Sequence, residues 1–205
     1  MGITLQQFNE MNARVSGRKT RAVGRGVDPL PSSPVSTHKI ILGVDPSLRG
    51  TGYGVIELAK PFPRTLAHGT ISCPKDWPHS RCLAHISQTL RDVLKKFQPT
   101  VCAVEGLFFA QNIKTAIIMG EARGAALAVI GEAGLEIYEI APRKVKQAIV
   151  GYGAAQKLAV AKMVQRFLQL AELPGPDAAD ALALALVQGQ TQERSRYSLS
   201  AAKQI

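Results

Sequence analysis

The chain has few cysteines and no long apolar run. Its 205 residues include three cysteines, none of them in a CxxC pair, so neither a disulfide framework nor a cysteine-rich zinc module is expected. No apolar segment approaches the roughly 18 residues that cross a membrane, and the N-terminus lacks the apolar core of a secretory signal. We therefore expect a cytoplasmic protein with no membrane partner.

Acidic residues are scarce relative to basic ones. The 25 Lys and Arg residues outnumber the 15 Asp and Glu residues, which gives a formal net charge of +10. A surplus of this size favours an acidic polymer as the partner, and nucleic acid before a membrane surface. General solubility is the competing explanation of the charge.

The composition divides the chain into three parts. Residues 1–38 are basic and end in a segment rich in proline and serine, a composition that resists packing. We interpret them as a flexible basic arm that either contacts DNA phosphates or has no part in binding; a transit peptide is a further alternative. Residues 39–189 form the predicted folded domain, and residues 190–205 a polar, frayed tail.

The hydrophobic pattern of the central part predicts an α/β fold. Apolar segments with the character of strands, and segments with helical spacing, follow one another in a regular order. Three hairpin-connected strands come first, and helices and strands alternate after them, which indicates a mixed sheet with helices on both faces. The predicted strands are 40–44, 51–58, 65–73, 100–104 and 135–140, and the predicted helices are 78–97, 112–132, 142–149, 155–170 and 176–189.

Four carboxylates occupy positions that suit chemistry. Asp45 and Glu105 each close an apolar strand, and strand ends in such sheets often open onto sites. Asp177 and Asp180 lie three residues apart on one face of an Ala/Leu-rich helix. Capping of the helix explains Asp177 equally well. Asp180 lies among apolar residues, where a carboxylate needs a cation or a partner.

An all-oxygen set of this kind suits Mg²⁺ or Mn²⁺. Two such ions can activate a water molecule and stabilise the leaving oxygen of a phosphodiester. A basic protein that holds an acidic metal cluster is therefore predicted to be a nuclease.

A basic cluster precedes the last acids. Arg143, Lys144, Lys146 and Lys157 flank the glycine-rich loop 151–153. Such a cluster is usually a solvated face, and contact with phosphates is the functional alternative.

Two further features are ambiguous from the sequence alone. Phe108 and Phe109 lie in a predicted loop, where they either pack in the core or stack on bases. Gly120, Gly124 and Ala128 form a stripe of small residues that permits close packing against the protein's own sheet or against another subunit.

Taken together, these motifs resemble the RuvC-type Holliday junction resolvase family. The resemblance covers about residues 39–189 in the family's order, through segments 41–46, 51–56, 97–108, 112–124, 145–154 and 177–183. It implies a ribonuclease-H-like fold and a homodimer. It also implies paired nicks across a four-way DNA junction with 5′-phosphate products, in DNA recombination and repair. A branch-migration helicase complex is the partner by analogy.

The resemblance assigns roles to individual residues. It implies that the acids bind two Mg²⁺ ions, with Mn²⁺ as a substitute and with Asp45 bridging both ions. Phe108 matches an aromatic residue that the family inserts at the junction, and Lys146 and Lys157 match basic residues near the scissile strand. The implied catalytic and metal-binding set is Asp45, Glu105, Asp177 and Asp180. The predicted DNA-binding set adds Asn112 and the rest of the basic cluster to the matched residues: it is Phe108, Asn112, Arg143, Lys144, Lys146 and Lys157.

The chain also departs from the family. Ser47 follows Asp-Pro where glycine is usual, and Gly106 and Leu107 follow Glu105 where a polar residue is common. The short family members have no counterpart of the N-terminal arm.

Three rival functions remain. An actin-like ATPase accounts for residues 45–55 but not for the final acids or the charge. Another ribonuclease-H-like nuclease, acting on RNA hybrids or transposon ends, stays open. A junction-binding protein without catalysis fits less well, because all four acids are present.

Overall fold

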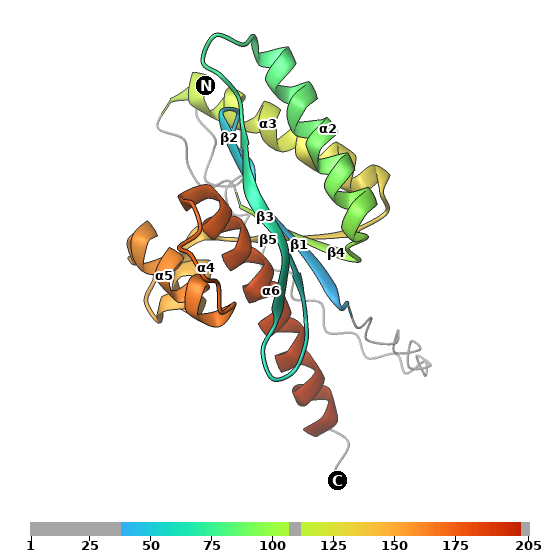
Figure 1. The fold of residues 1–205 in the computed structure, drawn as a ribbon, viewed down its shortest axis with the longest axis vertical. Helices are drawn as coiled ribbons and strands as arrows, with labels where there is room; N and C mark the ends of the chain where they lie inside the picture. Colours follow the sequence, from blue (N-terminus) through green and yellow to red (C-terminus); the bar gives the residue numbers. More distant parts are fainter. Residues whose placement is uncertain (1–37, 107–111, 202–205) are drawn as a thin grey trace, which may run out of the picture. The chain divides into compact units, whose positions relative to one another are not determined.

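The computed structural model describes residues 38–106 and 112–201, which contain a single five-stranded sheet (Figure 1). Its strands lie in the order β3-β2-β1-β4-β5. Neighbouring strands among β1, β2 and β3 are antiparallel, and β4 is parallel to both β1 and β5, so the predicted mixed sheet is confirmed. The strands are β1 (Ile40–Asp45), β2 (Gly50–Glu57), β3 (Arg64–Ser72), β4 (Val101–Glu105) and β5 (Glu136–Ile140).

Helices cover both faces of this sheet, as the sequence predicts (Figure 1). Side chains alternate along a strand, so Leu42 and Val44 of β1 join one apolar cluster and Ile41 joins the other. None of the helices in the described part of the chain is long and apolar enough to cross a membrane. The first face carries α2 (His79–Phe97) and α3 (Ile113–Glu132), and the second carries α4 (Pro142–Val150), α5 (Lys157–Phe167) and α6 (Pro176–Ala201).

The last helix is longer than predicted. The sequence analysis ended it at residue 189 and expected a frayed segment after that, but α6 continues to Ala201. Gly189 does not end the helix; its missing side chain instead leaves room for the side chain of Leu58. A Cβ atom at Gly189 would lie 2.7 Å from the Leu58 Cδ2 atom. The glutamines and Glu193 that follow are good helix formers, so the helix extends past this contact.

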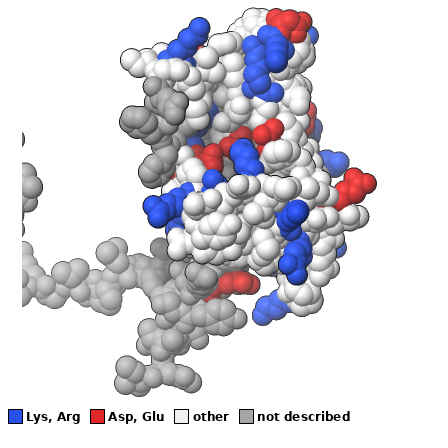
Figure 2. Space-filling model, turned by 90° about the vertical axis from the view of Figure 1, so that its left-hand side faces the viewer, with Lys and Arg blue, Asp and Glu red and all other residues white. Residues whose placement is uncertain are grey.

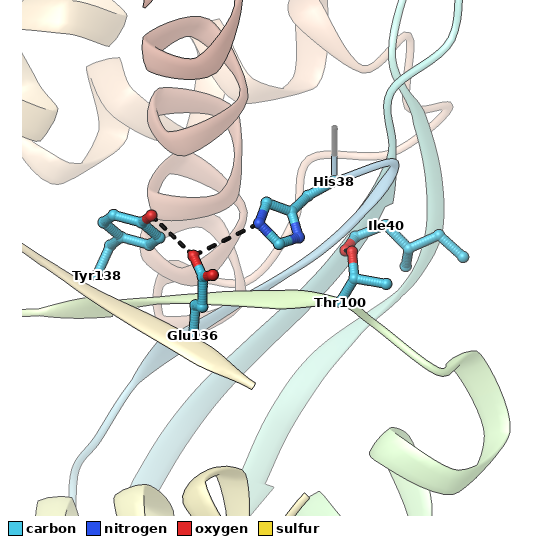
Figure 3. Close-up of polar contacts among 5 residues, drawn as sticks. All are labelled: His38, Ile40, Thr100, Glu136 and Tyr138. Atoms are coloured by element: carbon cyan, nitrogen blue, oxygen red, sulfur yellow. Dashed lines mark hydrogen bonds and ion pairs between the residues drawn. The ribbon is translucent and has the colours of Figure 1, made fainter. Parts of the chain in front are cut away.

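Polar contacts tie together the starts of three strands (Figure 3). The Thr100 amide donates to the Ile40 carbonyl over 3.0 Å, which joins β4 to β1. On β5, the Glu136 carboxylate lies 3.6 Å from His38 Nε2 and accepts a 2.9 Å hydrogen bond from the Tyr138 hydroxyl. This hydrogen bond is the main cause of a raised pKa at Tyr138. These contacts fix the sheet at the end opposite to Asp45 and Glu105.

Glycines let α6 lie directly on the sheet. Gly43 of β1 and Gly52 of β2 face this helix, and they leave room for its backbone. A Cβ atom would lie 1.9 Å from the Ala181 carbonyl oxygen at Gly43, and 2.0 Å from the Asp177 carbonyl oxygen at Gly52. No side chain fits there without displacing α6. The missing side chains therefore set how closely Asp177 and Asp180 approach the strands.

We predict that Gly43→Ala destabilises the protein by about 1–3 kcal/mol, because the added methyl group meets helix backbone that has no rotamer to change. Thermal and urea denaturation measure the effect. Gly131→Ala is the matched control: within the described part of the chain, no atom outside the helix backbone lies within 4 Å of its Cβ position, and alanine is the better helix former. An unchanged melting temperature for Gly43→Ala would contradict the close contact with α6.

Candidate active site

Asp45 and Glu105 lie side by side on the face of the sheet that α6 covers. Each is the last residue of its strand, and the parallel register pairs the preceding residues, Val44 and Val104. Ile41 of β1 and Ala103 of β4 belong to the cluster that packs against α6. By the alternation of side chains, the two carboxylates point to the same side.

The two carboxylates share a proton in the absence of metal. Burial raises the pKa of Asp45 to about 8, with the neighbouring charges of Glu105 and Asp180 adding to the effect. Burial also raises the pKa of Glu105, whereas its hydrogen bond with Asp45 acts in the opposite direction. Asp45 is therefore the donor and Glu105 the acceptor. The charge of Lys157 lowers both pKa values, but it does not offset the effect of burial.

Asp180 of α6 adds a third carboxylate and brings a lysine with it. The Lys157 Nζ atom lies 2.9 Å from Asp180 Oδ2, and the exposed fraction of the side chain is 21% for Asp180 and 64% for Lys157. The hydrogen bond to Asp180 is the main cause of the raised pKa of Lys157, and the charges of Asp45 and Asp177 act in the same direction. Lys157 thus compensates part of the charge of the acids.

Asp177 lies at the start of α6, beside the beginning of β2. A Cβ atom at Gly50 would lie 2.9 Å from Asp177 Oδ2, so the glycine leaves room for this carboxylate. The structure therefore brings all four predicted acids, from β1, β4 and α6, to the end of the sheet where β1 and β4 finish. Acidic side chains gather in a central band between basic ones on the face drawn in Figure 2.

The donor set fits a hard metal ion, although the acids are not arranged around one. Within residues 38–106 and 112–201, no three Asp, Glu, His or Cys side chains lie close enough to enclose a metal. The acids instead have partners within the protein: Asp180 is paired with Lys157, and Asp45 is hydrogen-bonded to Glu105. Carboxylate oxygens of this kind are the donors that suit Mg²⁺ and Mn²⁺.

The predicted DNA-binding residues differ in their positions. Lys146 is half-buried on α4, and its charge lowers the pKa of Glu105, which places it with the acids. Arg143 and Lys144 are exposed on the same helix, and the Arg143 side chain lies against Gly153. Asn112 caps α3, as predicted, by accepting a 2.7 Å hydrogen bond from the Thr115 amide.

The aromatic residue predicted for the junction, Phe108, lies outside the described residues, as does Phe109. The predicted basic arm also lies outside them, except for His38.

Sequence reasoning missed one residue that contacts the site. Arg123 of α3 donates a hydrogen bond to the backbone carbonyl of Glu105 and pairs with Glu139 of β5. Its only signal in the sequence is an arginine in a helix of alanines and glycines, next to the buried Ala122.

Comparison with known proteins identifies the family. The family described as "Crossover junction endodeoxyribonuclease RuvC" matches residues 41–188. The protein of that name from Thermotoga petrophila is 45% identical over 146 residues, which are 71% of this chain and 88% of the relative. The protein of that name from Treponema pallidum (strain Nichols) is 38% identical over 180 residues, or 87% of this chain and 91% of the relative.

Solved structures agree with this match. The structure described as "T. thermophilus RuvC in complex with Holliday junction substrate" has a TM-score of 0.69 and 34% identity, covering 76% of this chain and 98% of the other. The yeast mitochondrial Holliday junction resolvase Ydc2, at 14% identity and a TM-score of 0.59, covers 80% of this chain and 83% of its own. Ydc2 shows likeness of fold alone, which is the predicted ribonuclease-H-like fold. From its matched sequence, its sheet order and its structural likeness, this chain belongs to the RuvC crossover junction endodeoxyribonuclease family.

Proposed function

We propose that this protein is a metal-dependent endonuclease that resolves Holliday junctions by paired nicks, in DNA recombination and repair. The observation that carries the proposal is that Asp45, Glu105 and Asp180 converge with Lys157 at the ends of β1 and β4, in a chain of this family. A buried acid cluster short of positive charge, in a protein of net charge +10, suits hydrolysis of an anionic backbone. The expected products carry 5′-phosphates.

The four acids are the proposed ligands of two Mg²⁺ ions, which Mn²⁺ can replace. Asp45 interacts with both Glu105 and Asp180, which suits a ligand shared by the two ions. The bound ions would supply an activated water and stabilise the leaving oxygen. The Lys157 ammonium group contacts Oδ2 of Asp180, and it is placed to contact a phosphate oxygen beside this carboxylate. Lys146 is placed to contact a phosphate of the same DNA strand.

The proposed substrate is a four-way DNA junction. A relative of known structure is described in complex with a Holliday junction, and the basic residues of α4 and α5 provide phosphate contacts beside the acids. Arg143 and Lys144 extend this basic surface, and Phe108 is proposed to contact bases at the junction. Because the chain belongs to this family, nothing supports the actin-like ATPase as its function. Whether the enzyme prefers a DNA junction or an RNA–DNA hybrid is tested by the cleavage experiment below.

A homodimer supplies the two sites that paired nicks require. Among the described residues, no atom outside the helix backbone lies within 4 Å of the Cβ positions of Gly120 and Gly124, and Ala128 is exposed, so this stripe does not pack on the described sheet. The same helix exposes 80% of Ile113 and 56% of Ile117. An apolar face with room for a second backbone suits a second copy of α3. A branch-migration helicase complex is proposed as the partner that presents the junction.

We predict that Asp45→Asn abolishes cleavage and leaves junction binding intact, because the change removes a metal-binding charge and almost no surface. Labelled four-way junction, linear duplex and RNA–DNA hybrid, each incubated with Mg²⁺, measure activity and preference. Asp92→Asn, an exposed acid on α2, is the control and should cleave normally. Wild-type cleavage by Asp45→Asn would contradict the proposed site, and preferred cleavage of the hybrid would favour the other class of nuclease.

The raised pKa of Asp45 predicts a pH dependence of stability in the absence of metal. In the folded protein the Asp45 carboxyl keeps its proton up to about pH 8, whereas in the unfolded chain it loses the proton near its ordinary pKa of 3.8. The folded state therefore binds more protons between these values, and the free energy of unfolding falls as the pH rises.

In EDTA, the melting temperature of the wild type should accordingly fall from pH 5 to pH 8 relative to that of Asp45→Asn. The variant should be the more stable protein at pH 8. Parallel curves for the two proteins would show that Asp45 is not the group that holds the proton.

Phe108→Ala should slow the cleavage of an intact junction strongly, and that of a junction with a central mismatch much less. The reason is that bases at a mismatch are already partly unstacked, so the aromatic ring has less to contribute. Phe109→Ala is the control. Circular dichroism must first show that the variant is folded, because loss of a core Phe costs about 3–5 kcal/mol. Equal losses on both substrates would exclude a wedge role for Phe108.

A further inference from the structure

Arg123 reaches the end of β4 from the face opposite to α6. One guanidinium nitrogen, Nη1, donates to the backbone carbonyl of Glu105, and the other, Nη2, pairs with Glu139 Oε2 on β5. The exposed fraction of the Arg123 side chain is 12%, against 59% for Glu139. An arginine buried to this extent requires partners for its charge, and it has one of them on each of two adjacent strands.

The Glu105 carbonyl lies at the end of β4, where the hydrogen-bonded ladders between strands stop. The Gly106 amide donates to the Ile140 carbonyl over 2.9 Å, at the end of the β4–β5 ladder. On the two neighbouring strands, Pro46 directly follows β1 and Pro142 comes two residues after Ile140. Proline has no amide hydrogen with which to extend a ladder. A side-chain donor from α3 thus replaces backbone pairing at the residue that carries the carboxylate.

Glu139 lies over the glycine that follows Glu105. A Cβ atom at Gly106 would lie 3.0 Å from Glu139 Oε1 and 3.2 Å from Glu139 Cγ. Glycine at this position is one of the departures from the family pattern, in which a polar residue is common. In this chain, the Glu139 carboxylate occupies that space and holds the Arg123 guanidinium.

We propose that Arg123 is a positioning residue for Glu105, and that Glu139 orients its guanidinium group. The planar fork binds two acceptors at fixed geometry, so it fixes the backbone of residue 105 and with it the direction in which the Glu105 carboxylate leaves the strand. This inference rests on the proposed metal site. A residue that supports a metal ligand in this way typically contributes about 10–100-fold to metal affinity.

The test measures Mn²⁺ binding by the full-length protein, using calorimetry and the electron paramagnetic resonance signal of free Mn²⁺. Arg123→Met should weaken Mn²⁺ binding by about tenfold without changing junction affinity in EDTA. Glu139→Gln should act in the same direction with a smaller effect. Arg91→Met is the matched control, because Arg91 forms a 3.2 Å ion pair with Glu132 between α2 and α3, with both side chains more than half exposed. It should bind Mn²⁺ like the wild type.

A double-mutant cycle separates positioning from a merely structural role. If Arg123 acts through Glu105, Arg123→Met should cause no further loss of Mn²⁺ affinity in a Glu105→Gln background. An equal loss in both backgrounds overturns the proposal. Wild-type Mn²⁺ affinity in Glu105→Gln overturns the metal site itself, and with it this inference.

Arg123→Lys decides the matter if Arg123→Met does not fold. Lysine keeps the charge but has no planar fork to reach both acceptors, so a folded Arg123→Lys should bind Mn²⁺ more weakly than the wild type. Wild-type affinity in the folded lysine variant overturns the proposal.

Discussion

The contact between the backbone of α6 and the glycines of β1 and β2 is the constraint on which the rest of the site depends. Helices ordinarily pack on a sheet through side chains on both sides. Here Gly43 and Gly52 contribute none, and carbonyl oxygens of Asp177 and Ala181 occupy the space that a Cβ atom would need. This approach brings the first turns of α6 onto the strand ends. The depth of helix docking therefore determines how far Asp177 and Asp180 lie from Asp45.

The electrostatics of the site disfavour the charged forms of its own carboxylates. Burial at the strand ends disfavours the charged forms of Asp45 and Glu105, and Asp180 adds a further negative charge. The fold tolerates this through a shared proton and the Lys157 ammonium group. In the proposed metal site, a bound cation would replace both compensations, since a proton and a flexible lysine leave without disturbing the backbone. Stability is thereby reduced at the place where the proposed chemistry requires unneutralised carboxylates.

The sequence was informative wherever a pattern is local. Strand and helix positions followed from hydrophobic spacing, and Asp45 and Glu105 stood out because each closes an apolar strand. It was uninformative for contacts between distant segments: nothing near Arg123 announces a partner at Glu105 or Glu139, and nothing near Lys157 announces Asp180. The length of α6 was missed for a related reason, since the role of Gly189 depends on Leu58, far away in the chain.

The origin of the four acids in β1, β4 and α6 has a consequence for biosynthesis. A chain that has emerged only as far as α5 carries Asp45 and Glu105 but lacks both acids of the last helix, and its glycine-lined strands have no backbone to contact. Such a chain already has the basic residues of α4 and α5, so it can meet nucleic acid before it has a complete set of carboxylates. In the proposed nuclease, the set of four carboxylates is thus complete only once α6 has been synthesised and packs on the sheet.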